Sequence, residues 1–452
     1  MEAAERTKTE PSNATHLCVL VHGLWGNPDH LAYIADALRD KYHEDQLHIL
    51  IAKSNSGNFT YDGIETGAER VTQEIEETIA KLERDGSKIK KISMLGYSLG
   101  GLVARYSIGL LHSNGWLDRL EPINFTTFAS PHLGVRTPIL GYQSHLWNLF
   151  GSRTLSMSGK QLFGDDTFRD TGRPILCVLA DPSSIFMQAL SRFKHRTLYA
   201  NIINDRSAPY YTTFITKIDP YINLDSININ YVKGYAPNII DPANPVSLKP
   251  EAPPPTVLGQ IAGTGQNLLN NAPFYAAMSL LLPLGTTAYL VNAGIQSVRS
   301  QNRIKLHESG QAGVGLGNYR IPLMIENARS AVEGTFGSMN SSNLEYHAAG
   351  TGATSESFSD VHDEKMILNE RSSSTDLVCT PSSAQPKFPA LNLSPDQFEM
   401  IENLDKAGFK KYAVHIQNVR HTHAAIVVRM KQRRFDEGKL VIKHWLDEEF
   451  EI

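Results

Sequence analysis

Residues 92–101 read Ile-Ser-Met-Leu-Gly-Tyr-Ser-Leu-Gly-Gly, and this stretch decides the fold of the chain. Its first four residues are β-prone, and the run Leu-Val-Ala-Arg-Tyr that follows continues as an apolar helical stripe. A Gly-x-Ser-x-Gly sequence between a strand and a helix is typical of a nucleophile elbow, in which a sharp turn exposes the serine hydroxyl. Gly96 and Gly100 let neighbouring backbone pass close to the turn. We therefore predict that Ser98 is a catalytic nucleophile.

A second signature lies at residues 17–26, which read Leu-Cys-Val-Leu-Val-His-Gly-Leu-Trp-Gly. The uncharged apolar run predicts a buried parallel strand, and His22 begins the loop after it. In α/β-hydrolases this loop supplies one backbone N–H of the oxyanion hole, and the residue after the nucleophile supplies the other. The two amides predicted for that role are those of Leu24 and Leu99.

The remaining sequence from 16 to 240 alternates strand and helix signals, with the clearest helix at 64–84. The strand candidates are 17–22, 47–53, 90–97, 122–129, 174–180 and 197–203. This alternation predicts an α/β-hydrolase fold, with a mostly parallel sheet, helices on both faces and active residues at the carboxyl ends of the strands. A further strand at 411–416 and a helix at 436–449 return to globular character. The predicted organisation is a tail at 1–14 and a core made of 15–240 and 391–452.

Residues 241–390 form the predicted insertion. Residues 252–298 contain no Asp, Glu, Lys, Arg or His, and 337–389 are rich in Ser, Thr, Gly and Asn, which predicts an irregular loop. Pro283 and Gly285 interrupt the apolar run, and Arg299, Arg303 and Lys305 follow it. A broken apolar segment with a basic flank favours insertion into one leaflet or a droplet monolayer over crossing a bilayer. A buried lid or core hairpin is the alternative interpretation.

A serine nucleophile needs a base and an orienting carboxylate, which follow it in the order Ser, Asp or Glu, His in this fold. Asp205 follows the strand candidate 197–203 and is the predicted acid; Asp181 follows 174–180 in the same way and is the alternative.

The base is expected in the segment after the last strand, where His421 and His423 are both candidates. We favour His423, because the adjoining Ala424 and Ala425 leave room for its imidazole. His132 follows the strand candidate 122–129, and we expect it, with His22, to border the pocket.

Composition argues against several other classes of protein. The formal net charge is −4, and no long basic run suggests nucleic-acid binding. No His, Cys and carboxylate cluster has metal-ligand spacing, and no phosphate loop or dinucleotide fingerprint is present, so no metal or cofactor is expected. The 3 cysteines are far apart, and the acidic N-terminus has no hydrophobic leader, which predicts a cytoplasmic protein.

Taken together, five segments give the chain a resemblance to a known family: 22–28, 96–101, 130–134, 199–205 and 421–429. The chain resembles the DUF676 serine esterase/lipase group of α/β-hydrolases and is most similar to its fungal lipid-droplet phospholipase branch. Members often have Val-Pro after the acid-containing turn, where this chain has Ala208-Pro209.

The resemblance supports Ser98, Asp205 and a histidine of the 421–423 pair as the triad. It implies hydrolysis of acyl esters in glycerophospholipids, with a lipid as substrate and, given the uncharged insertion, a lipid droplet or the endoplasmic-reticulum membrane as the surface. A neutral-lipid lipase, an acyltransferase with the same triad and a catalytically silent membrane-associated protein are the alternatives.

Overall fold

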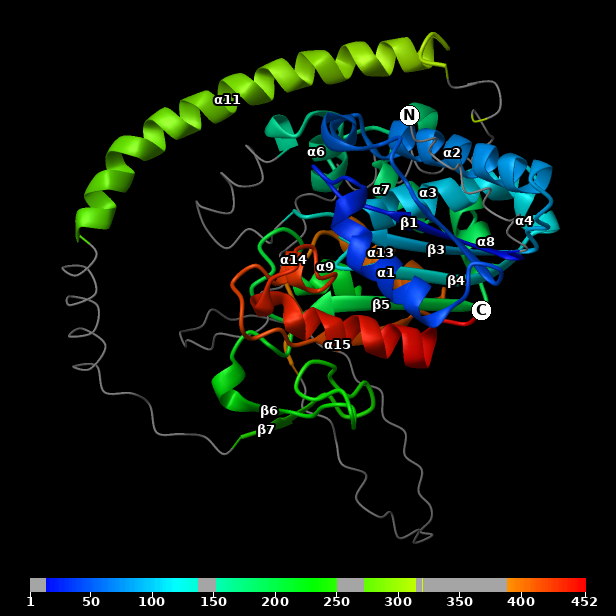
Figure 1. Ribbon diagram of the computed structural model, residues 1–452. Helices are drawn as coiled ribbons and strands as arrows, with labels where there is room; N and C mark the ends of the chain where they lie inside the picture. The colour runs from blue at the N-terminus through cyan, green and yellow to red at the C-terminus, as the bar shows by residue number, and fades with distance from the viewer. Residues whose placement is uncertain (1–13, 137–151, 250–271, 314–318, 320–387) are drawn as a thin grey trace, which may run out of the picture.

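The computed structural model describes residues 14–136, 152–249, 272–313, 319 and 388–452 (Figure 1). Most of the predicted tail, the first part of the uncharged segment and nearly all of the predicted loop at 337–389 lie outside the described residues. The strands are β1 (His16–Val21), β2 (Leu47–Ile51), β3 (Lys91–Tyr97), β4 (Glu121–Phe128), β5 (His195–Asn201), β6 (Ile227–Ile229), β7 (Val246–Leu248) and β8 (Lys410–Val414).

The helices vary from single turns to one of 37 residues. The α-helices are α1 (Ala32–Lys41), α2 (Ile64–Arg84), α3 (Leu99–Ser113), α4 (Trp116–Arg119), α6 (Ser156–Phe163), α7 (Ile175–Ala180), α8 (Ile185–Ser191), α9 (Tyr210–Phe214), α11 (Ala272–Glu308), α13 (Pro395–Asp405), α14 (Thr422–Ala425) and α15 (Asp436–His444). Short 3₁₀ turns are η1 (Pro28–Leu31), η2 (Gly57–Tyr61), η3 (Arg169–Thr171), η4 (Leu224–Ser226) and η6 (Arg433–Phe435), and η7 (Trp445–Glu449) is a π-helical turn.

The central sheet has the order β2-β1-β3-β4-β5-β8, and all of its neighbours are parallel. Its register aligns the carboxyl ends of the strands, because Tyr97 pairs with Phe128, Phe128 with Tyr199, and Asn201 with Val414. Loops that leave these ends therefore meet along one edge of the sheet. The predicted α/β-hydrolase fold is confirmed, and the six strands differ from their predicted bounds by one or two residues.

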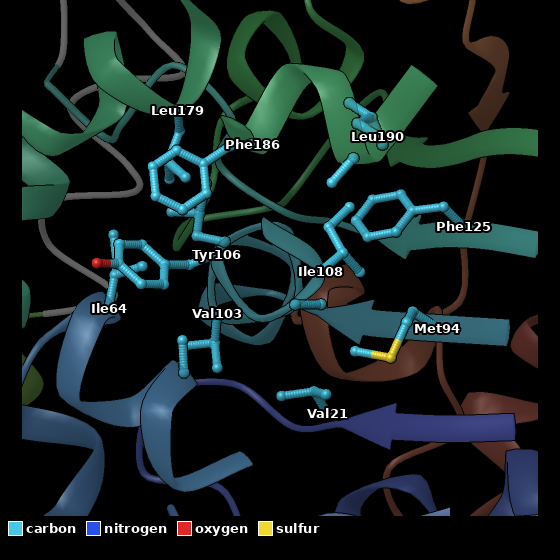
Figure 2. Packing of buried hydrophobic residues seen from close by; sticks show 14 of the residues in the cluster. Val21, Ile64, Met94, Val103, Tyr106, Ile108, Phe125, Leu179, Phe186 and Leu190 are labelled. Atoms are coloured by element: carbon cyan, nitrogen blue, oxygen red, sulfur yellow. The ribbon is translucent and has the colours of Figure 1, made fainter. Parts of the chain in front are cut away.

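Helices cover both faces of this sheet, and the alternation of side chains along each strand explains how. On one face, strand residues such as Val21, Met94 and Phe125 pack against α2, α3, α7 and α8 (Figure 2). On the other face, Cys18, Leu20 and neighbouring residues pack against α1 and α15. The helix predicted at 64–84 is α2, with the same bounds, and it buries one apolar stripe. The last strand, β8, joins the sheet beside β5 although a long insertion separates them in sequence.

The strand predicted at 174–180 is wrong, because these residues form the helix α7. Pro174 precedes the helix, and the six residues from Ile175 to Ala180 are all buried in the helical layer. A short apolar run that is buried on every side carries no periodicity that separates a strand from a helix.

The predicted break at Pro283 is also wrong, since α11 runs continuously from Ala272 to Glu308 and arches past the α/β domain (Figure 1). The helix is curved along its length in Figure 1. Across the described parts of the chain, no helix combines the length and apolar character needed to cross a bilayer.

Candidate active site

Ser98 occupies the turn between β3 and α3, with φ 56° and ψ −131°. A positive φ at a residue other than glycine is strained and persists only where the surroundings enforce it. Here they do so by close approach: a Cβ on Gly96 would lie 2.3 Å from the Cα of Gly101, and one on Gly100 would lie 2.2 Å from the carbonyl oxygen of Val21. The spacing of the elbow glycines is therefore a packing requirement, as the motif predicted.

The structure brings Ser98, His423 and Asp205 into one hydrogen-bonded chain. His423 Nε2 lies 2.9 Å from Ser98 Oγ, and His423 Nδ1 lies 2.8 Å from Asp205 Oδ2. Because an ionised carboxylate only accepts hydrogen bonds, Nδ1 carries the proton and leaves Nε2 free to accept the serine proton. This is the arrangement in which a histidine can act as a general base toward a serine.

Asp205 is held by its own turn. Its Oδ1 accepts hydrogen bonds from the amides of Ser207 (3.0 Å) and Ala208 (2.9 Å), and its Oδ2 accepts one from Asn201 Nδ2 (3.0 Å). Burial by itself would raise the pKa of Asp205, but the neighbouring His423 and these hydrogen bonds outweigh it and hold the pKa below its usual range. The carboxylate is thus ionised at neutral pH and orients the imidazole.

Sequence reasoning missed two contacts that hold the His423 loop. Tyr97 Oη donates a hydrogen bond to the carbonyl oxygen of His423 (2.9 Å), and the two rings lie 5.1 Å apart. Thr422 Oγ1 donates to the carbonyl oxygen of Ile203 (2.8 Å) in the acid loop. Tyr97 is the variable residue before the serine in the elbow, so the motif names its position without indicating its partner.

The loop after β1 passes directly against the nucleophile. A Cβ on Gly23 would lie 2.6 Å from the Cβ of Ser98, so only glycine fits there. The loop turns back through a hydrogen bond from the Gly26 amide to the Gly23 carbonyl (3.0 Å) and a positive φ of 54° at Trp25. Leu24 lies within this turn, and Leu99 is the first residue of α3, whose amide has no partner within the helix. Leu24 thus follows the glycine that lies against Ser98, and Leu99 follows Ser98 itself; their role as oxyanion donors stays a prediction.

The two predicted pocket histidines lie in different surroundings. His22 is buried at the start of the loop, where its Nε2 lies 3.1 Å from Ser56 Oγ. His132 is fully buried in the interior, with Nε2 3.0 Å from Thr127 Oγ1 and Nδ1 3.4 Å from Arg105 Nη1. Burial, and secondarily the Arg105 charge, place the pKa of His132 well below its usual value, so its imidazole is neutral. His132 is thus an interior residue, and its place beside the substrate pocket stays a prediction.

The alternative triad residues are not joined to Ser98. Asp181 ends α7, where it pairs with Arg173 (3.3 Å) and accepts hydrogen bonds from Ser183. His421 is the exposed residue that precedes α14. Within the described ranges, no three His, Cys, Asp or Glu side chains are grouped as they would be around a metal ion.

Residues 11–218 match the family described as "Putative serine esterase (DUF676)". The match covers a little less than half of the chain. The resemblance predicted from the sequence motifs is therefore confirmed.

Two fungal relatives are named as lipases. The chain is 34% identical over 248 residues to "Putative lipase ROG1" of Saccharomyces cerevisiae, which covers 53% of this chain and 34% of the relative. It is 28% identical over 211 residues to "Putative lipase C4A8.10" of Schizosaccharomyces pombe, which covers 45% of this chain and 26% of the relative. The matched part of this chain thus spans about a third or less of these relatives. Among solved structures, phospholipase PlaB from Legionella pneumophila is similar at 14% identity with a TM-score of 0.26, over 44% of this chain and 40% of that protein.

Proposed function

We propose that this protein is a serine hydrolase that cleaves acyl esters of glycerophospholipids at a lipid surface. The observation that carries the proposal is the hydrogen-bonded chain from Ser98 through His423 to Asp205, with distances of 2.9 and 2.8 Å. The family match and the lipase names of the relatives support a carboxylic ester as the substrate. The proposed reaction needs no cofactor, because the three side chains supply the nucleophile, the base and the orienting charge.

In the proposed reaction, Ser98 Oγ attacks the ester carbonyl carbon while His423 Nε2 accepts the serine proton. The tetrahedral intermediate places its negative oxygen between the amides of Leu24 and Leu99, and each such donor is worth on the order of 3 kcal/mol. His423 then donates its proton to the leaving alkoxide, and the acyl group stays on Ser98. Water, activated by the same imidazole, releases the fatty acid and restores the serine.

The lipid-surface part of the proposal rests on the polarity of α11. Its outward face exposes Val291, Ile295 and Val298 at the i, i+4, i+7 spacing of one helix side, and Leu306 extends this face. The opposite face, which is buried, includes the polar side chains of Gln296, Ser300 and His307. A helix of a soluble domain normally has the reverse polarity.

An apolar face on the outside fits a lipid surface better than water. We call the residues Leu290, Val291, Ile295, Val298 and Leu306 the apolar stripe; all five are exposed. The basic residues Arg299 and Lys305 on the same helix suit anionic headgroups. We propose a lipid droplet or the cytosolic face of the endoplasmic reticulum as the surface.

Labelling with a fluorophosphonate, followed by product analysis on mixed lipids, tests this function. Wild type is expected to label at Ser98 and to release fatty acid and lysophospholipid from phospholipid. Ser98→Ala is expected to abolish labelling and to lower turnover by several orders of magnitude while the protein stays folded. Release from triacylglycerol alone would indicate a neutral-lipid lipase, and transfer of the acyl group to an added alcohol would indicate an acyltransferase. A folded wild type that neither labels nor hydrolyses esters would contradict the proposal.

A further inference from the structure

The 3₁₀ turn η2 (Gly57–Tyr61) lies between two parts of the molecule that the proposed function uses separately: the oxyanion loop at 22–26 and the lipid-facing helix α11. Its contacts with each part are polar and well defined, and they suggest that the two parts act together.

On one side, η2 holds the oxyanion loop. The Trp25 amide donates to Thr60 Oγ1 (3.0 Å), and the Trp25 indole N–H donates to Tyr61 Oη (2.8 Å). The Gly57 amide donates to the Gly26 carbonyl (2.7 Å). Because Trp25 directly follows Leu24 and has a strained positive φ, these bonds fix the peptide plane next to the Leu24 amide.

On the other side, Arg303 of α11 forms hydrogen bonds with η2 and with Asp62, the residue that follows it. Its Nη2 donates to the Asn58 carbonyl (2.8 Å) and to Asp62 Oδ1 (2.7 Å), and its Nε donates to Asp62 Oδ2 (2.9 Å). The guanidinium also stands over the Phe59 ring, 5.4 Å from its centroid. Ser300, one turn earlier on α11, donates to Asp62 Oδ1 (2.7 Å).

The contacts of Arg303 matter because Asp62 is a buried carboxylate. Its side chain has no solvent exposure, and Arg70 of α2 pairs with it at 2.9 Å. A buried carboxylate depends on its partners, since removal of one partner leaves charge uncompensated in a medium that solvates it poorly. The position of η2 is therefore sensitive to whether Arg303 is in place.

We propose that Arg303 is a positioning residue for the oxyanion hole, so that the docking of α11 on the domain holds the Leu24 amide in its productive orientation. The inference rests on the proposed function of Ser98 and adds a mechanical link from the lipid-facing helix to the acyl chemistry. The link runs from Arg303 to η2, directly at Asn58 and through the adjoining Asp62, and from Thr60 and Tyr61 of η2 to Trp25. Coupling of this kind travels through contiguous hydrogen-bonded and packed groups.

The test compares Arg303→Met with Arg119→Met on a short water-soluble ester in the absence of lipid. Arg119 is an exposed control with similar contacts: it pairs with Glu83 (3.2 Å) and stands over the Trp116 ring (4.7 Å), but it lies on α4, beyond the end of α3 that is far from Ser98 (Figure 1). We expect Arg303→Met to lower kcat about ten-fold with KM unchanged, because a displaced oxyanion donor weakens only the transition state. Affinity for a trifluoromethyl ketone, which forms a tetrahedral adduct with the serine, should fall by a similar factor. Arg119→Met should change neither quantity.

Two further measurements keep the test decisive. Arg303→Lys retains the buried charge and supports folding, yet cannot reproduce the forked contacts, so it should give a smaller loss in the same direction. Hydrogen–deuterium exchange in 22–27 and 56–61 should be faster in Arg303→Met than in wild type and in Arg119→Met. Wild-type kcat, inhibitor affinity and exchange in a folded Arg303→Met would overturn the proposal. If the wild type hydrolyses no ester, the proposed function fails, and exchange alone then decides whether the link exists.

Discussion

Four hydrogen bonds converge on the Asp205 carboxylate, and only one of them comes from His423. The other three come from its own turn and from Asn201, the last residue of β5. The carboxylate therefore has a fixed orientation before the imidazole meets it. At the scale of single residues, this fixes which tautomer of His423 faces Ser98.

Asp205→Asn should leave the fold intact and lower kcat by about 10⁴-fold, because an amide permits the tautomer that points a proton at Ser98. Steady-state kinetics on a soluble ester, with circular dichroism as a check of folding, measure this. Asp181→Asn is the control, since Asp181 is the alternative acid, follows α7 and pairs with Arg173 without being joined to Ser98. Inactivity of Asp181→Asn together with an active Asp205→Asn would show that the acid is assigned wrongly.

Tyr97→Phe should lower kcat several-fold without a change in KM, because the His423 carbonyl loses its donor while the ring packing remains. Loss of one such bond is also expected to lower the free energy of unfolding by about 1 kcal/mol. Tyr412→Phe provides the comparison, since it removes a tyrosine hydrogen bond to Glu449 at a distance from the nucleophile. Equal kcat values for the two variants would argue against a positioning role for Tyr97.

At the scale of elements, α11 buries polar side chains and exposes apolar ones. Its buried face carries Gln296, Ser300 and His307, and its exposed face carries the apolar stripe. Burial of apolar surface contributes roughly 25 cal/mol per Å² of free energy, so transfer of the apolar stripe out of water is favourable. The same helix uses Arg303 to contact the domain, so the lipid contact that we propose and the domain contact involve different sides of one helix.

Val291→Asp combined with Val298→Asp should release the protein from liposomes and droplets, with little effect on a soluble ester. On binding, both carboxylates would have to leave water for an apolar phase, and this transfer costs more free energy than the burial of the apolar stripe contributes. Asn292→Asp with Gln301→Asp adds the same charge to exposed positions beside the stripe and should preserve binding. Co-flotation with phospholipid vesicles measures both variants. If the stripe variant still floats with the vesicles, lipid attachment lies elsewhere in the chain.

At the scale of the whole molecule, the C-terminal residues complete both the sheet and the site. β8 pairs with β5, α14 carries His423, and α15 with η7 covers the face of the sheet opposite α3. Trp445 is almost fully buried there; its indole N–H donates to Thr126 Oγ1 (3.0 Å), and its ring meets Phe128 and Phe450 edge-on. This segment therefore ties the last helix to the middle of the sheet.

Trp445→Ala should lower the free energy of unfolding by about 3–5 kcal/mol, through lost burial and the cavity left behind. Ile222→Ala is the control, because Ile222 is among the most exposed large apolar side chains in the described residues and should shift stability by less than about 0.5 kcal/mol. Urea unfolding followed by fluorescence and circular dichroism measures both. A change for Trp445→Ala no larger than that of the control would mean that η7 is not part of the cooperative core.

Local sequence determines the parts of this protein whose conformation depends on near neighbours in the chain. The elbow around Ser98 and the loop at 22–26 can be predicted from the sequence, because their glycines occupy positions where a Cβ would collide with backbone or with the serine. The strands of the sheet are readable because buried parallel strands are apolar throughout.

Tertiary structure alone decided the rest. Asp205 and His423 are 218 residues apart, and both acid and base candidates satisfied the same order in the chain until β5 and β8 paired. The apolar run at 174–180 suits a strand or a helix equally, and its place in the helical layer settled it. The contacts from Arg303 through η2 to Trp25 join three segments that are distant in the sequence. They form because packing brings the buried Asp62 carboxylate next to Arg303 and Arg70, and no local sequence pattern predicts this pairing.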